Sequence, residues 1–346
     1  MQRTDRLLKY MKENSIDCAV ITDRANIHYL SGFTGSAGYL IISESEKLLI
    51  TDFRYTEQAS IQAKEYEIID VANFDRGGYA KKFSKVGFED TTISYTQYKG
   101  LEKDFENPVP LGNTVINMRS VKTNEEIEFI RKAAKIADDA FSHILTMMKA
   151  GMTEIEVARE IDFYMLKNGA DALSFDTIVA SGERGSMPHA TPGKNILKDG
   201  DLVVMDFGCV YNGYCSDMTR TVGIGNIDND CREAYNTVLK AQLSALEMIK
   251  SGVSCAKVHG KAFDIIDGAY PNMFGHALGH GVGLEIHEQP TFSKRSDYPL
   301  PEGAVITVEP GVYIPGKCGV RIEDLVLVTA DRYDNLTSSP KELIII

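Results

Sequence analysis

Residues 199–213, DGDLVVMDFGCVYNG, align without gaps on residues 302–316, EGAVITVEPGVYIPG, and this pair of stretches decides the fold. At a constant shift of 103 residues (302 − 199), three glycines meet glycines and Asp206 meets Glu309. Such matches in register, with an acid placed on an acid, indicate a duplicated unit related by a pseudo-two-fold axis. An active site is therefore expected between the two copies.

Helical sequence precedes each of these stretches. Asn124 is a favourable N-cap with two glutamates behind it, and it predicts a helix that continues to about Ala150. Thr153 and Glu156 form a capping box that predicts a second helix. The remaining elements expected in this half of the chain are strands within 175–223, helices over 229–250 and 255–267, and strands with glycine-rich turns after them.

The first part of the chain predicts a separate, smaller α/β domain, since 346 residues are too many for one ordinary core. We expect domains at residues 1–120 and 121–346. The expected elements of the first domain are helices over 3–12 and 55–63 and strands over 17–22, 38–43, 47–51 and 65–71. The glycine cluster at 31–38 lacks both GxGxxG and a P-loop lysine, so it indicates a turn rather than a phosphate cradle.

Composition limits the classes of partner. The chain has 49 acidic against 37 basic residues, a net charge of −12, which argues against nucleic acid. No apolar run is long enough to cross a membrane, and the charged, amphipathic N-terminus is unlike a signal peptide. Six scattered cysteines without a CxxC pair indicate free thiols in a reducing cytoplasm, with extracellular disulfides as the less favoured alternative.

The first hairpin brings two acids to one face. The Asn-Gly pair at 212–213 is a strong two-residue turn signal, and it places Asp206 opposite Thr219. Asp217 is then a diagonal neighbour on the same face, close enough to share a cluster of ions. The alternative is a pair of surface or salt-bridged acids, with Asp217 near Arg220.

The second hairpin, centred near Gly316, places Glu309 opposite Glu323. Like charges that face each other within apolar strands repel, so this pair predicts a cation between them. A register slip of one residue would send one of the two side chains to the other face.

Histidines complete the pattern. His276, His280 and His287 lie within twelve residues, and the surrounding glycines favour extended or looped backbone over a helix. Together with two facing acid pairs they indicate a metal site, to which His189 is a further candidate. His28, His143 and His259 are interpreted as structural. Carboxylates with imidazole suit two divalent ions, Mn²⁺ foremost, with Co²⁺ or Zn²⁺ as alternatives.

The chain resembles the prolidase and aminopeptidase P family of metallopeptidases over nearly its whole length. The specific motifs are DFG…SDMTRT, HALGHGVGLEIHE, VEPGVY and RIED, in this order. The resemblance implies a creatinase/prolidase-like α/β domain, often used in homodimer contacts, followed by a catalytic domain with the pita-bread fold. It implies five metal ligands, with Asp217 and Glu323 bridging the ions: Asp206, Asp217, His280, Glu309 and Glu323.

The resemblance also assigns roles around the metals. It implies that His189 and His276 line the substrate side, and that Arg321 and Tyr313 hold the proline residue or its carboxylate. A bland alternative makes Arg321 a surface partner of Glu323 or Asp324. Two further roles are expected on chemical grounds: Glu309 handles the proton of the attacking water, and His287 stabilises the oxyanion.

The expected substrate is a peptide with proline in the second position, cut at the bond before the proline. The GFTGSAG segment favours an Xaa-Pro aminopeptidase, and the alternative is an Xaa-Pro dipeptidase, or prolidase. A more distant alternative is a metal-free member of the fold, such as creatinase or a chromatin- or RNA-associated protein. That alternative predicts substitutions among the five ligand positions, and all five are intact.

Overall fold

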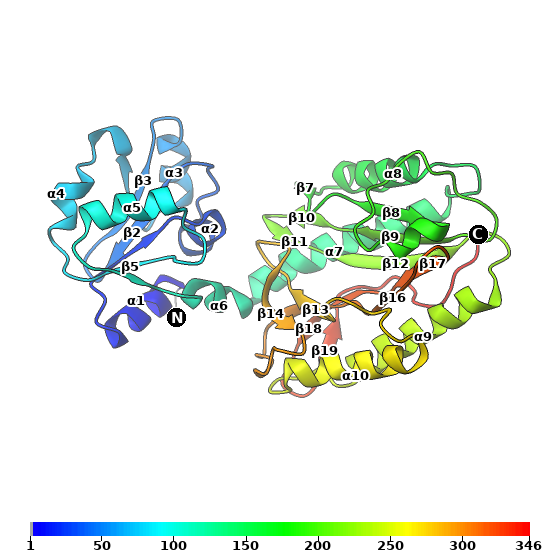
Figure 1. Ribbon diagram of the computed structural model, residues 1–346. Helices are drawn as coiled ribbons and strands as arrows, with labels where there is room; N and C mark the ends of the chain where they lie inside the picture. The colour runs from blue at the N-terminus through cyan, green and yellow to red at the C-terminus, as the bar shows by residue number, and fades with distance from the viewer. Residues whose placement is uncertain (1–2) are drawn as a thin grey trace. The chain divides into compact units, whose positions relative to one another are not determined.

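The computed structural model describes residues 3–346. Contacts divide the chain into two compact units, the first ending at Arg119 and the second beginning at Ser120. Each unit has its own sheets, and the predicted α/β fold is confirmed (Figure 1). No helix in the described range is both long and apolar enough to span a membrane.

The first unit is built on one six-stranded mixed sheet, ordered β4-β3-β2-β1-β5-β6. Its strands are β1 (Cys18–Ile21), β2 (Tyr39–Ser43), β3 (Lys47–Thr51), β4 (Glu67–Asp70), β5 (Val86–Phe88) and β6 (Pro108–Pro110). Its helices are α1 (Arg3–Glu13), α2 (Arg24–Ser31), α3 (Thr56–Gln62), η1 (Val71–Asn73), α4 (Arg76–Ala80), α5 (Tyr95–Asp104) and α6 (Thr114–Ser120). The two helices and four strands expected here all form, and consecutive residues of β1, β2 and β3 are buried in the core of this unit.

Four helices surround the strands of the second unit. They are α7 (Asn124–Leu145), α8 (Glu154–Lys167), α9 (Asn229–Leu246) and α10 (Cys255–Ala269). The capping box of Thr153 and Glu156 is confirmed. The predicted cap at Asn124 is wrong by one residue, because Thr123 forms a second capping box with Glu126. Each box satisfies helix N–H groups and stabilises its helix by about 1 kcal/mol.

Short strands form the interior of the second unit. They make sheets ordered β12-β9-β8, β11-β10-β7, β14-β13-β15-β18-β19 and β16-β17. In the first half lie β7 (Ala172–Leu173), β8 (Ile178–Ser181), the 3-10 helix η2 (Gly182–Ser186), β9 (Leu202–Phe207), β10 (Cys209–Tyr211), β11 (Tyr214–Cys215) and β12 (Met218–Gly223). In the second half lie β13 (Gly279–Gly281), β14 (Glu288–Phe292), β15 (Val305–Val308), β16 (Gly311–Ile314), β17 (Cys318–Arg321), β18 (Asp324–Val328) and β19 (Tyr333–Asn335).

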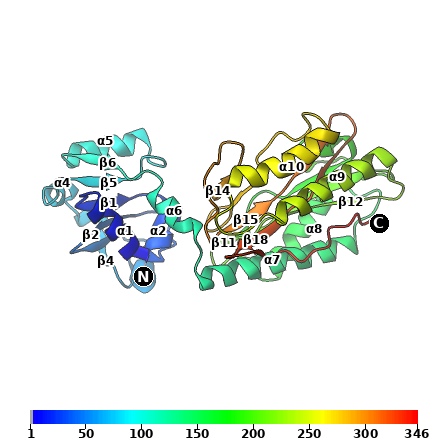
Figure 2. The ribbon, with the colours of Figure 1, turned by 90° about the horizontal axis from the view of Figure 1, so that it is seen from below.

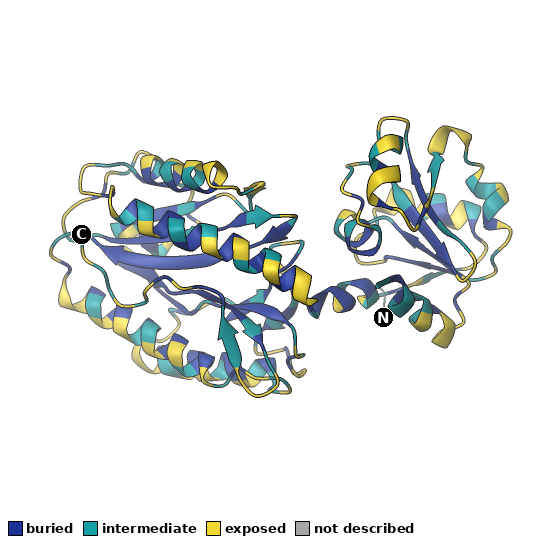
Figure 3. Ribbon diagram, turned by 180° about the vertical axis from the view of Figure 1, so that it is seen from behind, coloured by how far each residue is buried: buried dark blue, intermediate teal, exposed yellow. Residues whose placement is uncertain are grey.

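The duplication predicted from sequence is confirmed in three dimensions. Helices α7 and α8 share one apolar core with β9 and β12, whereas α9 and α10 share another with β15 and β18. Figure 2 shows the two helix pairs on opposite sides of the strands. The strands are buried and the outer helix faces exposed (Figure 3), so polar side chains on these strands must find partners inside the protein.

All six cysteines are buried and free, as the sequence predicts.

Candidate metal centre

The first hairpin positions Asp206 and Asp217. Strands β9 and β12 pair with Asp206 opposite Thr219, which confirms the register predicted from the Asn-Gly turn. Both turn residues have positive φ, 48° at Asn212 and 81° at Gly213, as a type I′ turn requires. Asp217 precedes β12 on the same face as Thr219, so the two acids are diagonal neighbours.

The second hairpin positions Glu309 and Glu323 in the same way. Val308 pairs with Asp324 on one side of them, and Gly311 pairs with Arg321 on the other. The two ladders share one register, which places Glu309 opposite Glu323 as predicted. Their backbone N–H groups bond elsewhere, to the Leu278 and Thr219 carbonyls, so the two halves of the repeat are joined at these acids.

His280 faces the acids from β13. Its Nδ1 lies 3.1 Å from the Gly281 carbonyl, which fixes Nδ1 as the protonated nitrogen and leaves the lone pair of Nε2 free for a ligand. Nε2 lies 3.4 Å from Glu309 Oε1 and 3.5 Å from Asp217 Oδ2. Ligand atoms of Asp217, His280 and Glu323 all lie within 4.8 Å of one another. The expectation that His280 sits on extended backbone is confirmed.

The electrostatics of this cluster fit divalent cations. Burial, followed by the charge of Glu323, raises the pKa of Asp217, and burial likewise raises the pKa of Glu323. Burial raises the pKa of Glu309 from 4.5 to about 8 and lowers that of His280 to about 4. Two buried oxygens, Asp206 Oδ1 and Glu323 Oε1, have no hydrogen-bond partner. Buried carboxylate oxygens left without donors are what a bound cation would satisfy.

Arg321 is buried beside the acids, and the alternative of a surface partner for Glu323 or Asp324 is wrong. Its Nη2 donates to Asp206 Oδ2 at 2.5 Å, its Nη1 to the Tyr313 hydroxyl at 2.9 Å. Asp324 instead pairs with Arg220, at 2.7 Å, which argues against the alternative in which Arg220 pairs with Asp217.

The cluster opens into a cavity of about 370 Å³. The residues that line it include His189, His280 and His287, together with the four acids of the two hairpins. The ring of His287 lies 4.4 Å from that of His280, edge to face. Neither His276 nor Arg321 is among the described residues that line the cavity, and His276 Nε2 lies 3.0 Å from the Tyr313 hydroxyl.

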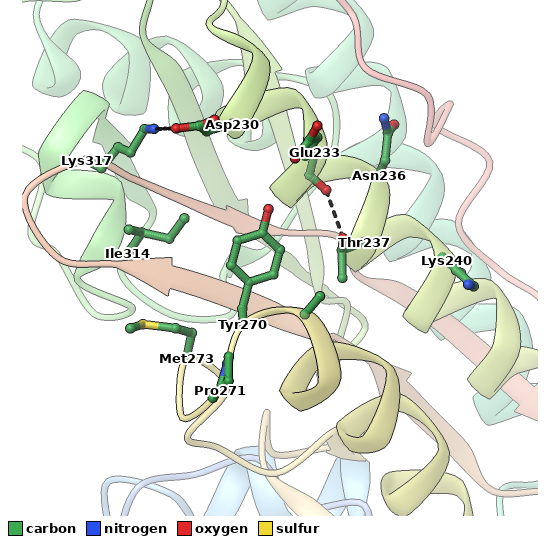
Figure 4. Close-up of a pocket in the computed structure, with 11 residues that line it drawn as sticks. Asp230, Glu233, Asn236, Thr237, Lys240, Tyr270, Pro271, Met273, Ile314 and Lys317 are labelled. Atoms are coloured by element: carbon green, nitrogen blue, oxygen red, sulfur yellow. Dashed lines mark hydrogen bonds and ion pairs between the residues drawn. The ribbon is translucent and has the colours of Figure 1, made fainter.

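A second hollow of about 770 Å³ lies elsewhere, between α9, the end of α10 and the β16–β17 hairpin (Figure 4). None of the predicted site residues lines it within the described chain. Two of its charged lining residues, Lys317 and Asp230, form an ion pair. The chemistry therefore belongs to the smaller cavity.

Thr219 is a site residue that the sequence reasoning named only as a register partner. Its hydroxyl donates to Glu323 Oε2 at 2.6 Å and accepts from Arg321 Nε at 3.0 Å. The internal repeat could have identified Thr219 as a site residue, because Thr219 occupies the position in the first hairpin that Glu323 occupies in the second.

Two known families match this chain. Metallopeptidase family M24 matches residues 128–330, and the Creatinase/Prolidase N-terminal domain matches residues 3–121. A protein named Xaa-Pro dipeptidase from Pyrococcus furiosus is 39% identical over 99% of both chains.

Two solved structures are similar over the whole length. One, named Xaa-Pro dipeptidase, from Bacillus anthracis, is 43% identical with a TM-score of 0.95 over 99% of both chains. The other, named X-Pro aminopeptidase, from Thermotoga maritima, is 38% identical with a TM-score of 0.90 over 100% of both. The aminopeptidase preference drawn from GFTGSAG is therefore not upheld, since the names of these relatives support the dipeptidase alternative better and the structure named dipeptidase is the more similar of the two. With its duplicated fold and buried acid cluster, the chain belongs to metallopeptidase family M24.

Proposed function

We propose that this protein hydrolyses the bond between an N-terminal residue and a following proline, using two divalent cations. The observation that carries the proposal is the set of four carboxylates that line one cavity with His280, of which two oxygens lack hydrogen-bond donors among the described residues. The proposed ligands are Asp206, Asp217, His280, Glu309 and Glu323, with Asp217 and Glu323 shared between the ions. Four negative charges balance two divalent cations, and the oxygen-rich set favours Mn²⁺ over Zn²⁺.

When bound, the cations supply an acidified water and polarise the scissile carbonyl. Glu309 accepts the proton of the attacking water, because its carboxylate lies at the inner end of the cavity. His287 donates to the developing oxyanion from the cavity wall. Arg321 holds Asp206 in place through its 2.5 Å contact, rather than binding substrate directly.

Proline defines the substrate class. A proline residue after the scissile bond has no N–H and a fixed φ, so it needs a pocket rather than a strand-like binding site. His189 and His287 border the cavity that would receive it, and His276 supports the wall through Tyr313. Names of similar proteins support an Xaa-Pro dipeptidase first. The T. maritima structure keeps Xaa-Pro aminopeptidase as a second candidate.

A peptide assay tests both the dipeptidase and the aminopeptidase candidates. We expect Mn²⁺-loaded protein to cleave Ala-Pro and to leave Pro-Ala and Ala-Ala intact. Ala-Pro-Ala separates the candidates: faster cleavage of the dipeptide supports the dipeptidase, and efficient cleavage of the tripeptide supports the aminopeptidase. Cleavage of neither proline peptide with Mn²⁺, Co²⁺ or Zn²⁺ would contradict the proposal.

The same proposal covers the division into domains, the oligomeric state and the cellular compartment. Residues 1–120 and 121–346 are proposed as separate domains, with the chemistry in the second, and the first making homodimer contacts. The six buried free thiols support residence in a reducing cytoplasm. Limited proteolysis near residue 120 and sedimentation analysis test the division and the dimer.

A further inference from the structure

One wall of the cavity is a loop rather than a strand. Residues 182–195, here called the His189 loop, form the first part of the connection from β8 to β9 and contain the short helix η2. Four consecutive residues of this loop, 189–192, line the cavity. Because a loop lacks the ladder of a sheet, its position depends on the contacts that its ends and middle make.

Glu154 holds both ends of this loop. Its side chain, in the first turn of α8, is fully buried. At the start of the loop it accepts from Ser181, at 2.9 Å from the N–H and 3.1 Å from the hydroxyl. At the end of the loop it accepts from the Gly193 N–H and from Asn195 Nδ2, each at 3.3 Å. One carboxylate therefore closes the loop at its base.

Arg184 extends this contact to the middle of the loop. Its Nε lies 3.1 and 3.0 Å from the two carboxylate oxygens of Glu154. Its Nη2 donates to the Thr191 carbonyl at 2.7 Å, two residues beyond His189. The charge of Glu154 is thus linked, through one guanidinium, to the segment that lines the cavity.

The loop is also seated on β17. A Cβ on Gly185 would lie 2.9 Å from the Gly319 backbone nitrogen, and a Cβ on Gly319 would lie 1.7 Å from the Gly185 carbonyl oxygen. Only two facing glycines permit this approach. The Pro188 carbonyl, next to His189, lies 3.5 Å from Nη1 of Arg321, which β17 carries.

Helix capping does not account for Glu154. The N-cap of α8 is already satisfied by Thr153 and Glu156, each of which bonds to the backbone N–H of the other. A buried carboxylate is costly unless it is hydrogen-bonded and paired, and within the described chain the Glu154 carboxylate bonds to Ser181 and to the His189 loop.

We propose that Glu154 is a positioning residue that sets the substrate-binding wall through the His189 loop. This proposal rests on the proposed function in one respect, because the assay that measures KM uses Xaa-Pro hydrolysis. His189 and its neighbours contact substrate, whereas the metal ligands lie on strands outside the loop. Loss of Glu154 therefore weakens substrate binding and leaves the cations in place.

Glu154→Gln tests this, because it keeps the size of the side chain, removes its charge and turns a donor toward the donors of the loop. We expect KM for the cleaved Xaa-Pro peptide to rise about tenfold or more, with kcat changed by less than about threefold. Metal content of the Mn²⁺-loaded protein stays at the wild-type value. Amide hydrogen exchange in 182–195 becomes faster, while exchange in β15 and β18 does not change.

The matched control is Glu156→Gln, two residues along the same helix turn, where the side chain is exposed and only caps the helix. It leaves KM and loop exchange at wild-type values. If Glu154→Gln fails to fold, Arg184→Met removes the link to Thr191 from a partly exposed position and shows the same KM rise in milder form.

A His189→Ala background makes the test specific. There Glu154→Gln produces no further rise in KM, because the loop no longer presents the side chain that it positions. Unchanged KM and loop exchange in Glu154→Gln, or the full KM rise persisting without His189, would overturn the proposal. If wild-type protein cleaves no Xaa-Pro peptide, the proposed function fails, while hydrogen exchange still decides whether Glu154 holds the loop.

Discussion

At single residues, the site depends on which atom of each side chain remains free. His280 commits Nδ1 to the Gly281 carbonyl, so Nε2 faces Glu309 and Asp217. Asp206 commits Oδ2 to Arg321 and leaves Oδ1 without a donor. The protein's own contacts thus orient these side-chain atoms toward one another, which is the arrangement that a preorganised metal site requires.

Removing one central ligand tests this preorganisation. Asp217→Ala and His280→Ala are each expected to abolish peptide hydrolysis, with a loss of at least about a hundredfold in kcat/KM. Both positions lie at the cavity, so the circular dichroism spectrum stays native. Asp176→Asn, which changes an acid of the same cavity lining outside the ligand set, is the control. A fully active Asp217→Ala protein would contradict the ligand assignment.

Protons and cations compete for these carboxylates. Burial raises the pKa of Glu309 from 4.5 to about 8, so between these values the metal-free folded protein holds a proton that the unfolded chain has lost. Stability of the metal-free protein therefore falls as pH rises through this window. A bound cation displaces the proton, so the melting-temperature difference between metal-loaded and metal-free protein grows from pH 5 to pH 8.

Calorimetry checks the same linkage directly. Titration of Mn²⁺ in two buffers with different ionisation enthalpies at pH 7 is expected to show net proton release. Heats that do not depend on the buffer, together with a constant melting-temperature difference, would mean that the carboxylates are already ionised without metal.

At the scale of elements, the two hairpins differ by a single residue. The first turn has two residues between Tyr211 and Tyr214, and the second has three between Ile314 and Cys318. The repeat shift is therefore 103 before the turn and 104 after it (323 − 219). In consequence, Glu323 occupies the place of Thr219, and the hydroxyl of Thr219 bonds to the carboxylate of Glu323 across the pseudo-dyad.

Close approach of the first hairpin to itself needs Gly208. A Cβ there would lie 1.9 Å from the Ser216 carbonyl oxygen, next to Asp217. Gly208→Ala is expected to destabilise the protein by about 1–3 kcal/mol, because the hairpin must shift to make room. Since that shift moves Asp217, Mn²⁺ affinity also falls. Thermal melting and metal titration measure both, with Gly252→Ala as a comparison that alters a glycine away from the site. Unchanged Mn²⁺ affinity would separate the hairpin from the metal centre.

A buried ion pair supports the loop that carries His287. Lys122 Nζ lies 2.8 Å from Glu288 Oε2, and each side chain is 1% exposed. Lys122→Met removes the cation that pairs with the buried Glu288 carboxylate and is expected to cost about 3–5 kcal/mol of folding free energy. Lys122→Met combined with Glu288→Leu restores most of that loss, because an apolar pair needs no charge partner. Chemical denaturation of both variants measures this, and equal instability of the two would contradict the account.

Local sequence patterns predicted much of the fold. Turn chemistry at 212–213 predicted the register of the first hairpin, and the capping box at Thr153 predicted the start of α8. Such local patterns could not predict contacts between residues far apart in the sequence. Arg321 reaches Asp206 from 115 residues away, and local sequence suggested its neighbours Glu323 and Asp324 instead. Asparagine is a favourable N-cap residue, which is why the sequence predicts Asn124 as the cap. The capping box of Thr123 with Glu126 satisfies more backbone donors.

At the scale of the whole molecule, the proposed metal centre draws its residues from two copies of one unit. Asp206 and Asp217 come from the first copy, and His280, Glu309 and Glu323 come from the second. Each copy has its own helix-covered core, and the copies also meet in a shared apolar cluster and in the buried pair of Arg220 with Asp324. Cations bound at the proposed metal centre would link the halves and raise stability by mass action.

Metal removal tests that link. Dialysis against a chelator is expected to abolish hydrolysis and lower the melting temperature, and added Mn²⁺ restores both. Undiminished activity after chelation, with no metal found by elemental analysis, would favour the metal-free alternative.

Anomalous diffraction from crystals soaked in Mn²⁺ tests the central claim most directly. Two peaks are expected, both within ligand distance of Asp217 and Glu323, with Asp206, His280 and Glu309 completing their coordination. A map with no peak among these five side chains, from protein that nevertheless cleaves Xaa-Pro peptides, would contradict the account.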